Sequence, residues 1–293
     1  MFSSHRAIRI ERAVDLIHQR YSNELTLDEM AAQACYSNWH FVRAFEAEIG
    51  EAPFDFLRKR RLYAAAYRLL SDARISISEL STRCGFQYAS SFSKGFRRQF
   101  GMTARDWRAG GWQHWVGEQP WHAATQNQPA RHTLLEHDAE QVRLVDPQSF
   151  SIEIVPAQPV VYRRLRGLWG DCLNDAAQQT LRDSPLPLPL CYGARHDFLH
   201  LRGPVESCYD LCVPVASDYA VPPTMGRASL FGGRYAVRRL APHEPYLSWR
   251  SVLASWPNRA RHVFDTRRPM IELYGWQGEH LCCTALYLPL AMS

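Results

Sequence analysis

Long apolar runs are absent from this sequence of 293 residues. No stretch of about 18 uncharged apolar residues could cross a bilayer, and the first residues lack the apolar segment of a signal peptide. We therefore expect a cytoplasmic protein with no membrane partner. The shares of hydrophobic residues, 46%, and aromatic residues, 12%, are high enough for packed cores, which excludes wholesale disorder.

Metal-ligand and catalytic patterns are also lacking. None of the eight cysteines forms a Cys-x-x-Cys pair, and four histidines between residues 114 and 137 are irregularly spaced, so we expect no metal site. Reduced thiols are expected in a cytoplasmic protein. Because no phosphate loop and no Ser-His-Asp pattern is evident, we expect neither an enzyme nor a cofactor.

Lysine is scarce, with Lys59 and Lys94 the only two, and arginine carries most of the basic charge. Residues 1–110 contain 17 basic and 12 acidic side chains, whereas residues 111–293 contain 17 of each. The whole net charge of +5 therefore lies in the first third. This asymmetry indicates an anionic partner, nucleic acid or a membrane surface, for that part alone.

An internal repeat organises the basic part. Residues 25–36 align with residues 75–86 at an offset of 50, and after a turn the offset becomes 51, as at Phe41 and Phe92. Each copy predicts two short helices around a tight turn, which is a helix-turn-helix. The expected helices cover residues 27–33, 38–48, 77–83 and 89–100.

The helix ends have local signals. Thr26 with Glu29, and Ser76 with Glu79, have the spacing of capping boxes, and Ser37 is expected to cap the second helix of the first copy. In the turns, Gly85 can adopt the left-handed conformation that ends a helix. Cys35 holds that place in the first copy, which implies some strain or a different turn.

The second helix of each copy has an apolar and a polar face. The apolar positions recur at helical spacing and should be core: Phe41, Phe45, Ile49, Phe92, Phe96 and Phe100. The candidate DNA-contacting side chains are Asn38, Trp39, Val42, Arg43, Ser90, Ser91, Ser93, Lys94, Arg97 and Arg98.

These side chains suit the major groove. Trp39 and Val42 fit contact with thymine methyl groups, and Arg43 fits a guanine edge or a phosphate. For Arg97 and Arg98 we expect phosphate neutralisation, which positions a protein without specifying a base. The alternative for Trp39 is burial against the neighbouring helix.

A single helix is expected between the copies, from Pro53 to Leu70. Its 18 residues would span about 27 Å, so that a stiff connector could hold two reading helices about one DNA turn, ~34 Å, apart. The basic run at residues 58–61 lies on this connector. It is either a solvated face or a set of phosphate contacts.

The runs 35–45, 50–62, 77–86 and 92–101 resemble the AraC/XylS DNA-binding domain, over residues 6–108. The resemblance implies a homeodomain-like pair of motifs whose second helices enter adjacent major grooves of double-stranded DNA. It also implies RNA polymerase as a partner. Cys35 departs from the family pattern, which usually has glycine there.

The C-terminal part has a different texture. Residues 111–148 have weak periodicity and are interpreted as a linker, and residues 149–293 as a second, α+β domain. Strands are expected at 150–155, 159–166, 190–196, 208–215, 230–240, 270–275 and 281–288, with helices near 169–183 and 245–256. An offset of 75 relates residues 162–165 to 237–240, which implies two strand-helix-strand-strand units.

Glu272 marks the place where this duplication breaks. Residues 191–193 match residues 273–275 at an offset of 82, so Glu272 replaces the apolar Leu190. A buried unpaired carboxylate is costly, so we expect Glu272 to be exposed, paired with an arginine, or bound to a ligand cation.

Aromatic side chains could wall a pocket at Glu272 and attract a cation through their rings; the candidates are Tyr274, Trp276, Tyr246 and Trp169. A structural ion pair with Arg238 or Arg239 is the alternative. The runs 208–215, 232–237 and 271–274 resemble the GyrI-like small-molecule-binding domain, over residues 150–290.

The GyrI-like resemblance implies a pseudo-twofold α+β fold with a central cleft, in which many members place a glutamate at the position of Glu272. The order of the two modules is that of Rob-like regulators. One departure, Gly167-Leu-Trp169 in place of the usual Gly-Pro-Tyr, implies an altered rim of the cleft.

Together these features predict a two-domain, sequence-specific DNA-binding transcription regulator, with an all-α double helix-turn-helix followed by a GyrI-like domain that senses a hydrophobic or cationic small molecule. Two alternatives remain open for the second domain. It could be a small-molecule hydrolase using Glu272 and Tyr274, or a ligand-free module that docks a partner.

Overall fold

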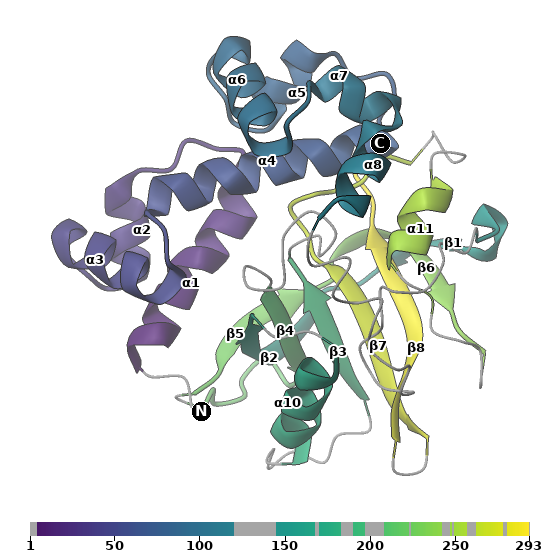
Figure 1. Ribbon diagram of the computed structural model, residues 1–293. Coiled ribbons are helices and arrows are strands. Elements are labelled where there is room, and N and C mark those ends of the chain that lie inside the picture. Colours follow the sequence, from purple (N-terminus) through teal and green to yellow (C-terminus); the bar gives the residue numbers. More distant parts are fainter. Residues whose placement is uncertain are drawn as a thin grey trace. The chain divides into compact units, whose positions relative to one another are not determined.

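The chain folds into two compact units, one helical and one rich in strands (Figure 1). The computed structural model describes residues 5–119, 145–167, 170–182, 190–196, 208–222, 224–241, 247, 249–256, 262–277 and 280–292. The first unit comprises Met1–Trp112 with Pro222–Gly226, and the second Gln113–Val221 with Arg227–Ser293. Among the described residues, no helix combines the length and apolar character needed to cross a bilayer.

Both predicted helix pairs are confirmed in the first unit. Its helices are α1 His5–Arg20, α2 Leu27–Gln33, α3 Asn38–Ile49, α4 Pro53–Ser71, α5 Ile77–Arg83, α6 Ala89–Phe100 and α7 Ala104–Asp106. The chain continues through the short π-helix η1, Trp107–Gly111, into α8, Trp112–Gly117, so the start of the expected linker is helical. The connector α4 runs between the two pairs (Figure 1).

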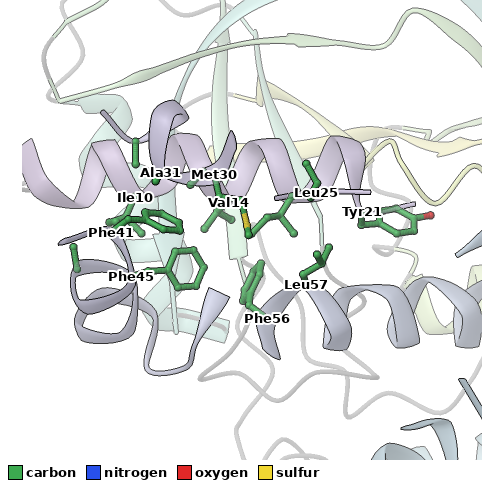
Figure 2. Packing of buried hydrophobic residues seen from close by; sticks show 14 of the residues in the cluster. Ile10, Val14, Tyr21, Leu25, Met30, Ala31, Phe41, Phe45, Phe56 and Leu57 are labelled. Atoms are coloured by element: carbon green, nitrogen blue, oxygen red, sulfur yellow. The ribbon is translucent and has the colours of Figure 1, made fainter. Parts of the chain in front are cut away.

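Each helix pair has its own aromatic core. In the first pair, Phe41 and Phe45 of α3 pack against Phe56 of α4 and against α1 (Figure 2). In the second pair, Phe96 and Phe100 of α6 are fully buried. Burial of a side chain of this size contributes about 1.5–3 kcal/mol. The predicted core face of each second helix is therefore confirmed, with Ile49 partly buried.

The helix ends follow the sequence signals with two differences. Thr26 and Glu29 form the full capping box of α2. The Ser76 side chain accepts from the amide of Glu79 at 3.1 Å, but the Glu79 carboxylate pairs with Arg83. Ser37 occupies the N-cap position of α3 without a capping hydrogen bond, so the expected cap is wrong.

The second unit contains one eight-stranded sheet in the order β1-β6-β8-β7-β3-β4-β2-β5. Its strands are β1 Ser151–Val155, β2 Gln158–Arg166, β3 Leu190–Arg195, β4 Cys208–Pro214, β5 Gly226–Leu230, β6 Gly233–Arg239, β7 Met270–Gln277 and β8 His280–Pro289. The helices are α10 Gly170–Arg182 and α11 Trp249–Ser255, with a 3-10 turn, η2, at Pro147–Ser149.

The strand order is symmetric about the central β7–β3 pair, because β6-β8-β7 on one side mirrors β2-β4-β3 on the other. Both strand-helix-strand-strand units of the predicted duplication are present. The strand expected at 230–240 is confirmed as β6 over residues 233–239, whereas β5 was not expected. Phe231 and Gly232 have φ angles of 65° and 78°, and this left-handed turn separates β5 from β6.

The two faces of the sheet carry separate cores, because alternate residues of a strand point to opposite faces. Ala177 and Leu181 of α10 pack on one face, against Leu165 and Tyr209. The other face holds a cluster that includes Tyr162, Tyr235 and Ile271. Glu272 follows Ile271 in β7 and therefore points to the same face as Tyr209.

Candidate nucleic-acid interface and buried carboxylate

The outer face of α3 presents a tryptophan and an arginine that contact each other. Trp39 is 62% exposed, so the alternative of a buried tryptophan is wrong. The guanidinium carbon of Arg43 lies 4.7 Å from the centroid of the Trp39 ring. His40 meets the same ring edge-on, with ring centroids 4.8 Å apart. Val42 is partly buried beside them.

Two polar groups at the start of α3 are held by protein partners. Asn38 donates its side-chain amide to the carboxylate of Asp28 in α2, so this candidate reader is tied to the neighbouring helix. The hydroxyl of Ser37 lies 2.9 Å from Nδ1 of His40. The first turn of α3 is thereby held by contacts between side chains, without a side-chain cap on its backbone amides.

The outer face of α6 presents hydroxyls and cations without an aromatic ring. Its candidate readers Ser90, Ser91, Ser93, Lys94, Arg97 and Arg98 are all exposed. The hydroxyl of Ser93 donates to the carbonyl of Ala89 at 2.9 Å.

The first turns of both reading helices lack a side-chain cap. In the described chain, neither Ser37 nor Tyr88 caps the helix that it precedes, whereas Thr26, Ser76 and Thr103 cap α2, α5 and α7. The free amides of a helix N-terminus attract anions such as phosphate. Both reading helices therefore have N-termini without a side-chain cap, as does α4, which follows Ala52.

The basic run of α4 serves the fold, so neither interpretation made for it holds at Arg60 and Arg61. Arg60 is 3% exposed and donates to Nδ1 of His18 at 3.0 Å. Arg61 donates to the carbonyls of Tyr21 and Asn23. The two flanking cations are paired as well, Arg58 with Asp55 and Lys59 with Glu51.

The second unit buries Glu272 at the centre of its sheet, with no exposed surface. Oε1 accepts from Nε of Arg195 at 2.7 Å and from Nε1 of Trp249 at 2.6 Å. Oε2 accepts from the hydroxyls of Tyr209 at 2.9 Å and Tyr274 at 2.7 Å. Each carboxylate oxygen thus has two donors.

The network keeps Glu272 ionised. Burial by itself raises the pKa of this carboxyl, but the charge of Arg195 and the surrounding donors outweigh it and hold the pKa below its ordinary value. Burial raises the pKa of Tyr209, as does the adjacent Glu272 charge, so this hydroxyl stays protonated as a donor. The site is a charged, buried cluster in which both carboxylate oxygens accept hydrogen bonds.

The expected ion-pair partners of Glu272 were wrong. Arg239 pairs with Glu153, and Arg238 donates to the carbonyl of Arg239. Arg195 takes that role because of the antiparallel β3–β7 pairing. This pairing places Glu272 opposite Gly193, and Arg195 lies two residues after Gly193 in β3.

A second buried carboxylate, Asp210, lies on the opposite face of the sheet. Arg164 donates to both of its oxygens at 2.6 Å, and Nε2 of His196 lies 2.8 Å from Oδ2. Burial raises the pKa of Asp210, but the charges of Arg164 and His196 prevail and the net shift is downward. Sequence reasoning did not single out this cluster.

The aromatic wall expected around Glu272 is described only in part. Tyr274 contacts the carboxylate, while Trp276, at the end of β7, is 41% exposed. Tyr246 and Trp169 lie outside the described residues. Arg195, Tyr209 and Trp249 were missed. Arg195 lay within the strand expected at 190–196, but only the pairing register connects it with Glu272.

Comparison with known proteins finds similarity in the helical part. The helix-turn-helix domain family matches residues 30–110. The chain is 32% identical over 105 residues to the regulatory protein SoxS of Escherichia coli K12, which covers 36% of this chain and 96% of SoxS. It is 28% identical over 99 residues, 34% of this chain, to the lactose operon transcription activator of Staphylococcus xylosus.

The match covers 35% of that activator, so the chain spans about a third of this relative's length. Among solved structures, the DNA-binding domain of AdpA in complex with a target DNA is similar, with 28% sequence identity and a TM-score of 0.33. That similarity covers 36% of this chain and 94% of the AdpA chain.

Proposed function

The chain belongs to the AraC family of DNA-binding transcription regulators, and on this premise we propose that α3 and α6 enter successive major grooves of double-stranded DNA. The relatives that match its helical part are named as a regulatory protein and a transcription activator, and we propose a regulator rather than an enzyme. The proposed DNA-contacting side chains are Asn38, Trp39, Val42, Arg43, Ser90, Ser91, Ser93, Lys94, Arg97 and Arg98.

One observation carries this proposal. Arg43, Lys94, Arg97 and Arg98 are exposed on the two reading helices, and none of these four forms a salt bridge within the described part of the chain. The run on α4, by contrast, is taken up by internal partners. Four exposed cations and two helix N-termini without a side-chain cap suit a row of phosphates.

Salt-dependent binding to duplex DNA tests the proposal. Binding that neutralises phosphates should weaken linearly with the logarithm of the salt concentration. Lys94→Ala should lower that slope by about 0.9 if Lys94 contacts one phosphate. Arg43→Ala should weaken binding to a preferred sequence by about 1–3 kcal/mol if it contacts a base.

Arg83→Ala is the matched control, because Arg83 lies on α5 and pairs with Glu79. Fluorescence anisotropy with a labelled duplex at several salt concentrations measures all three variants. Binding that ignores salt, or losses as large for Arg83→Ala as for Lys94→Ala, would contradict the proposal.

For the second unit we propose a sensing role, with a hydrophobic or cationic small molecule as effector. The ionised Glu272 supports an affinity for cations. The hydrogen bond from Trp249 to Glu272 connects the carboxylate to helix α11. A ligand cation would have to take the place of the Trp249 or Arg195 donor, since both oxygens of the carboxylate already have two. A ligand that favours one arrangement shifts the population toward it.

Thermal unfolding with a lipophilic organic cation tests this role. The wild type should be stabilised and Glu272→Gln should not, with Glu153→Gln as a control on a surface ion pair. Absence of a shift across a panel of such cations would favour the docking module instead. RNA polymerase remains the proposed protein partner and the cytoplasm the proposed location.

A further inference from the structure

The two reading helices carry different chemistry at equivalent positions. At the offset of 51 residues that relates α3 to α6, Trp39 corresponds to Ser90 and Arg43 to Lys94. The first copy therefore has an arginine stacked on a tryptophan, whereas the second copy has a lysine and a serine at the same two positions. The backbones repeat, since each helix has 12 residues and ends at a left-handed glycine, so the difference lies in the side chains.

In α3 the arginine is held before any DNA arrives. Its guanidinium lies over the Trp39 ring at 4.7 Å, and His40 supports the same ring from its edge. His40 is in turn fixed by Ser37 at 2.9 Å. A planar guanidinium presents a fork that can bond two acceptors of one guanine, and holding that fork in place lowers the entropy lost on binding.

In α6 no comparable support exists among the residues that the structure describes. Lys94 has neither a ring contact nor an ion pair there, and an ammonium on a flexible stem acts as a point charge. The Ser93 hydroxyl donates to the carbonyl of Ala89, so its proton is used within the helix. Arg97 and Arg98 add charge one turn later.

We infer that the two motifs divide the work: α3 selects the base sequence through Arg43, with Trp39 and His40 as positioning residues, while α6 binds its groove with little base preference. This inference rests on the proposed function, because both helices must bind DNA for their contributions to differ. It assigns specificity to one half of the DNA site and affinity to both.

Selection from a random-sequence duplex library by the full-length protein tests the inference. The wild type should enrich a strong preference in one half-site and a weak one in the other. Arg43→Lys keeps the charge and removes the fork, so it should reduce discrimination at one base pair by about 5- to 150-fold while leaving the salt dependence unchanged. Lys94→Ala should weaken binding to all sequences alike and leave the enriched sequence unchanged.

Variants of the positioning residues Trp39 and His40 distinguish a loss of stacking on Arg43 from a loss of folding. Trp39→Ala should reproduce the Arg43→Lys profile, Trp39→Phe should retain most of the wild-type preference because a ring remains, and His40→Ala should flatten the preference partly. Equal wild-type preference in both half-sites, or a Trp39→Ala profile identical to that of the wild type, overturns the inference. Salt-insensitive wild-type binding would instead overturn the proposed function.

Discussion

Gly193 lies directly opposite Glu272 in the β3–β7 ladder, and its missing side chain is what lets the carboxylate keep a donor. A Cβ at Gly193 would lie 1.6 Å from the Tyr209 hydroxyl oxygen, the atom that donates to Glu272. Leu190 and Gly275 face each other at the corresponding place in the ladder. The glycines are equivalent in the two units, so the duplication is broken at one position, where Glu272 replaces Leu190.

Gly193→Ala should therefore displace Tyr209 and destabilise the second unit by about 1–3 kcal/mol or more, as expected for overpacking. Urea denaturation measures the loss. Gly275→Ala is the matched control, because a Cβ there would meet Thr284 at 3.5 Å and Leu190 at 3.7 Å, which are ordinary contacts. Equal losses for the two variants would show that Tyr209 is not held as described.

Glu272→Gln should lower stability at pH 7 by about 3–5 kcal/mol, because it leaves Arg195 buried without its counter-charge. The folded-state pKa of Glu272 lies below the ordinary value of 4.5. Stability from its charge is therefore present above that value and is lost as the pH falls through the folded pKa. The difference from the wild type should shrink in acid, as followed by unfolding from pH 7 downward; a constant difference would contradict it.

Cys35→Gly should stabilise the first unit. Cys35 has a φ angle of 54°, a left-handed conformation that costs about 1–2 kcal/mol for a residue with a side chain. Glycine removes this strain, but it loses more conformational entropy on folding, which offsets part of the gain. We expect a net gain of about 0.5–1 kcal/mol in thermal unfolding.

The reverse change in the second copy should destabilise it. Gly85 has a φ angle of 84°, and a Cβ there would lie 2.9 Å from the carbonyl oxygen of Tyr21. Gly85→Ala therefore adds a clash to the strain, and we expect a loss above 1 kcal/mol. A stabilised Gly85→Ala variant would rule out this packing of the turn.

Arg60→Met should destabilise the first unit by about 1–3 kcal/mol, because it removes the donor to the buried His18. Arg58→Met, two residues earlier on α4, removes only a surface pair with Asp55 and should cost no more than about 1 kcal/mol. Denaturant midpoints compare the two. A larger loss of stability for Arg58→Met than for Arg60→Met would contradict the assignment of Arg60 as the buried cation and Arg58 as a surface cation.

The helices of the first unit could be predicted because their signals are local. A capping box places its two members three residues apart, as at Thr26 and Glu29, and the core face of α6 recurs every four residues at Phe92, Phe96 and Phe100. Such contacts form within one turn and need no knowledge of the rest of the chain.

The strands other than β5 were predicted in place but not in pairing. Alternation of apolar residues locates a strand, yet the register that puts Glu272 beside Arg195 joins residues 77 positions apart. The split between β5 and β6 depends on a left-handed Phe231, a conformation that a bulky residue rarely adopts.

The sequence by itself determined the duplicated helix-turn-helix, the confinement of the excess positive charge to it, and the α+β texture of the remainder. The tertiary structure decided which charges stay available. It buried Arg60 against His18 and left Arg43 stacked on an exposed Trp39. The reason is physical: helix periodicity is a property of neighbours along the chain, whereas the partner of a charge is set by whatever packing brings within hydrogen-bonding distance.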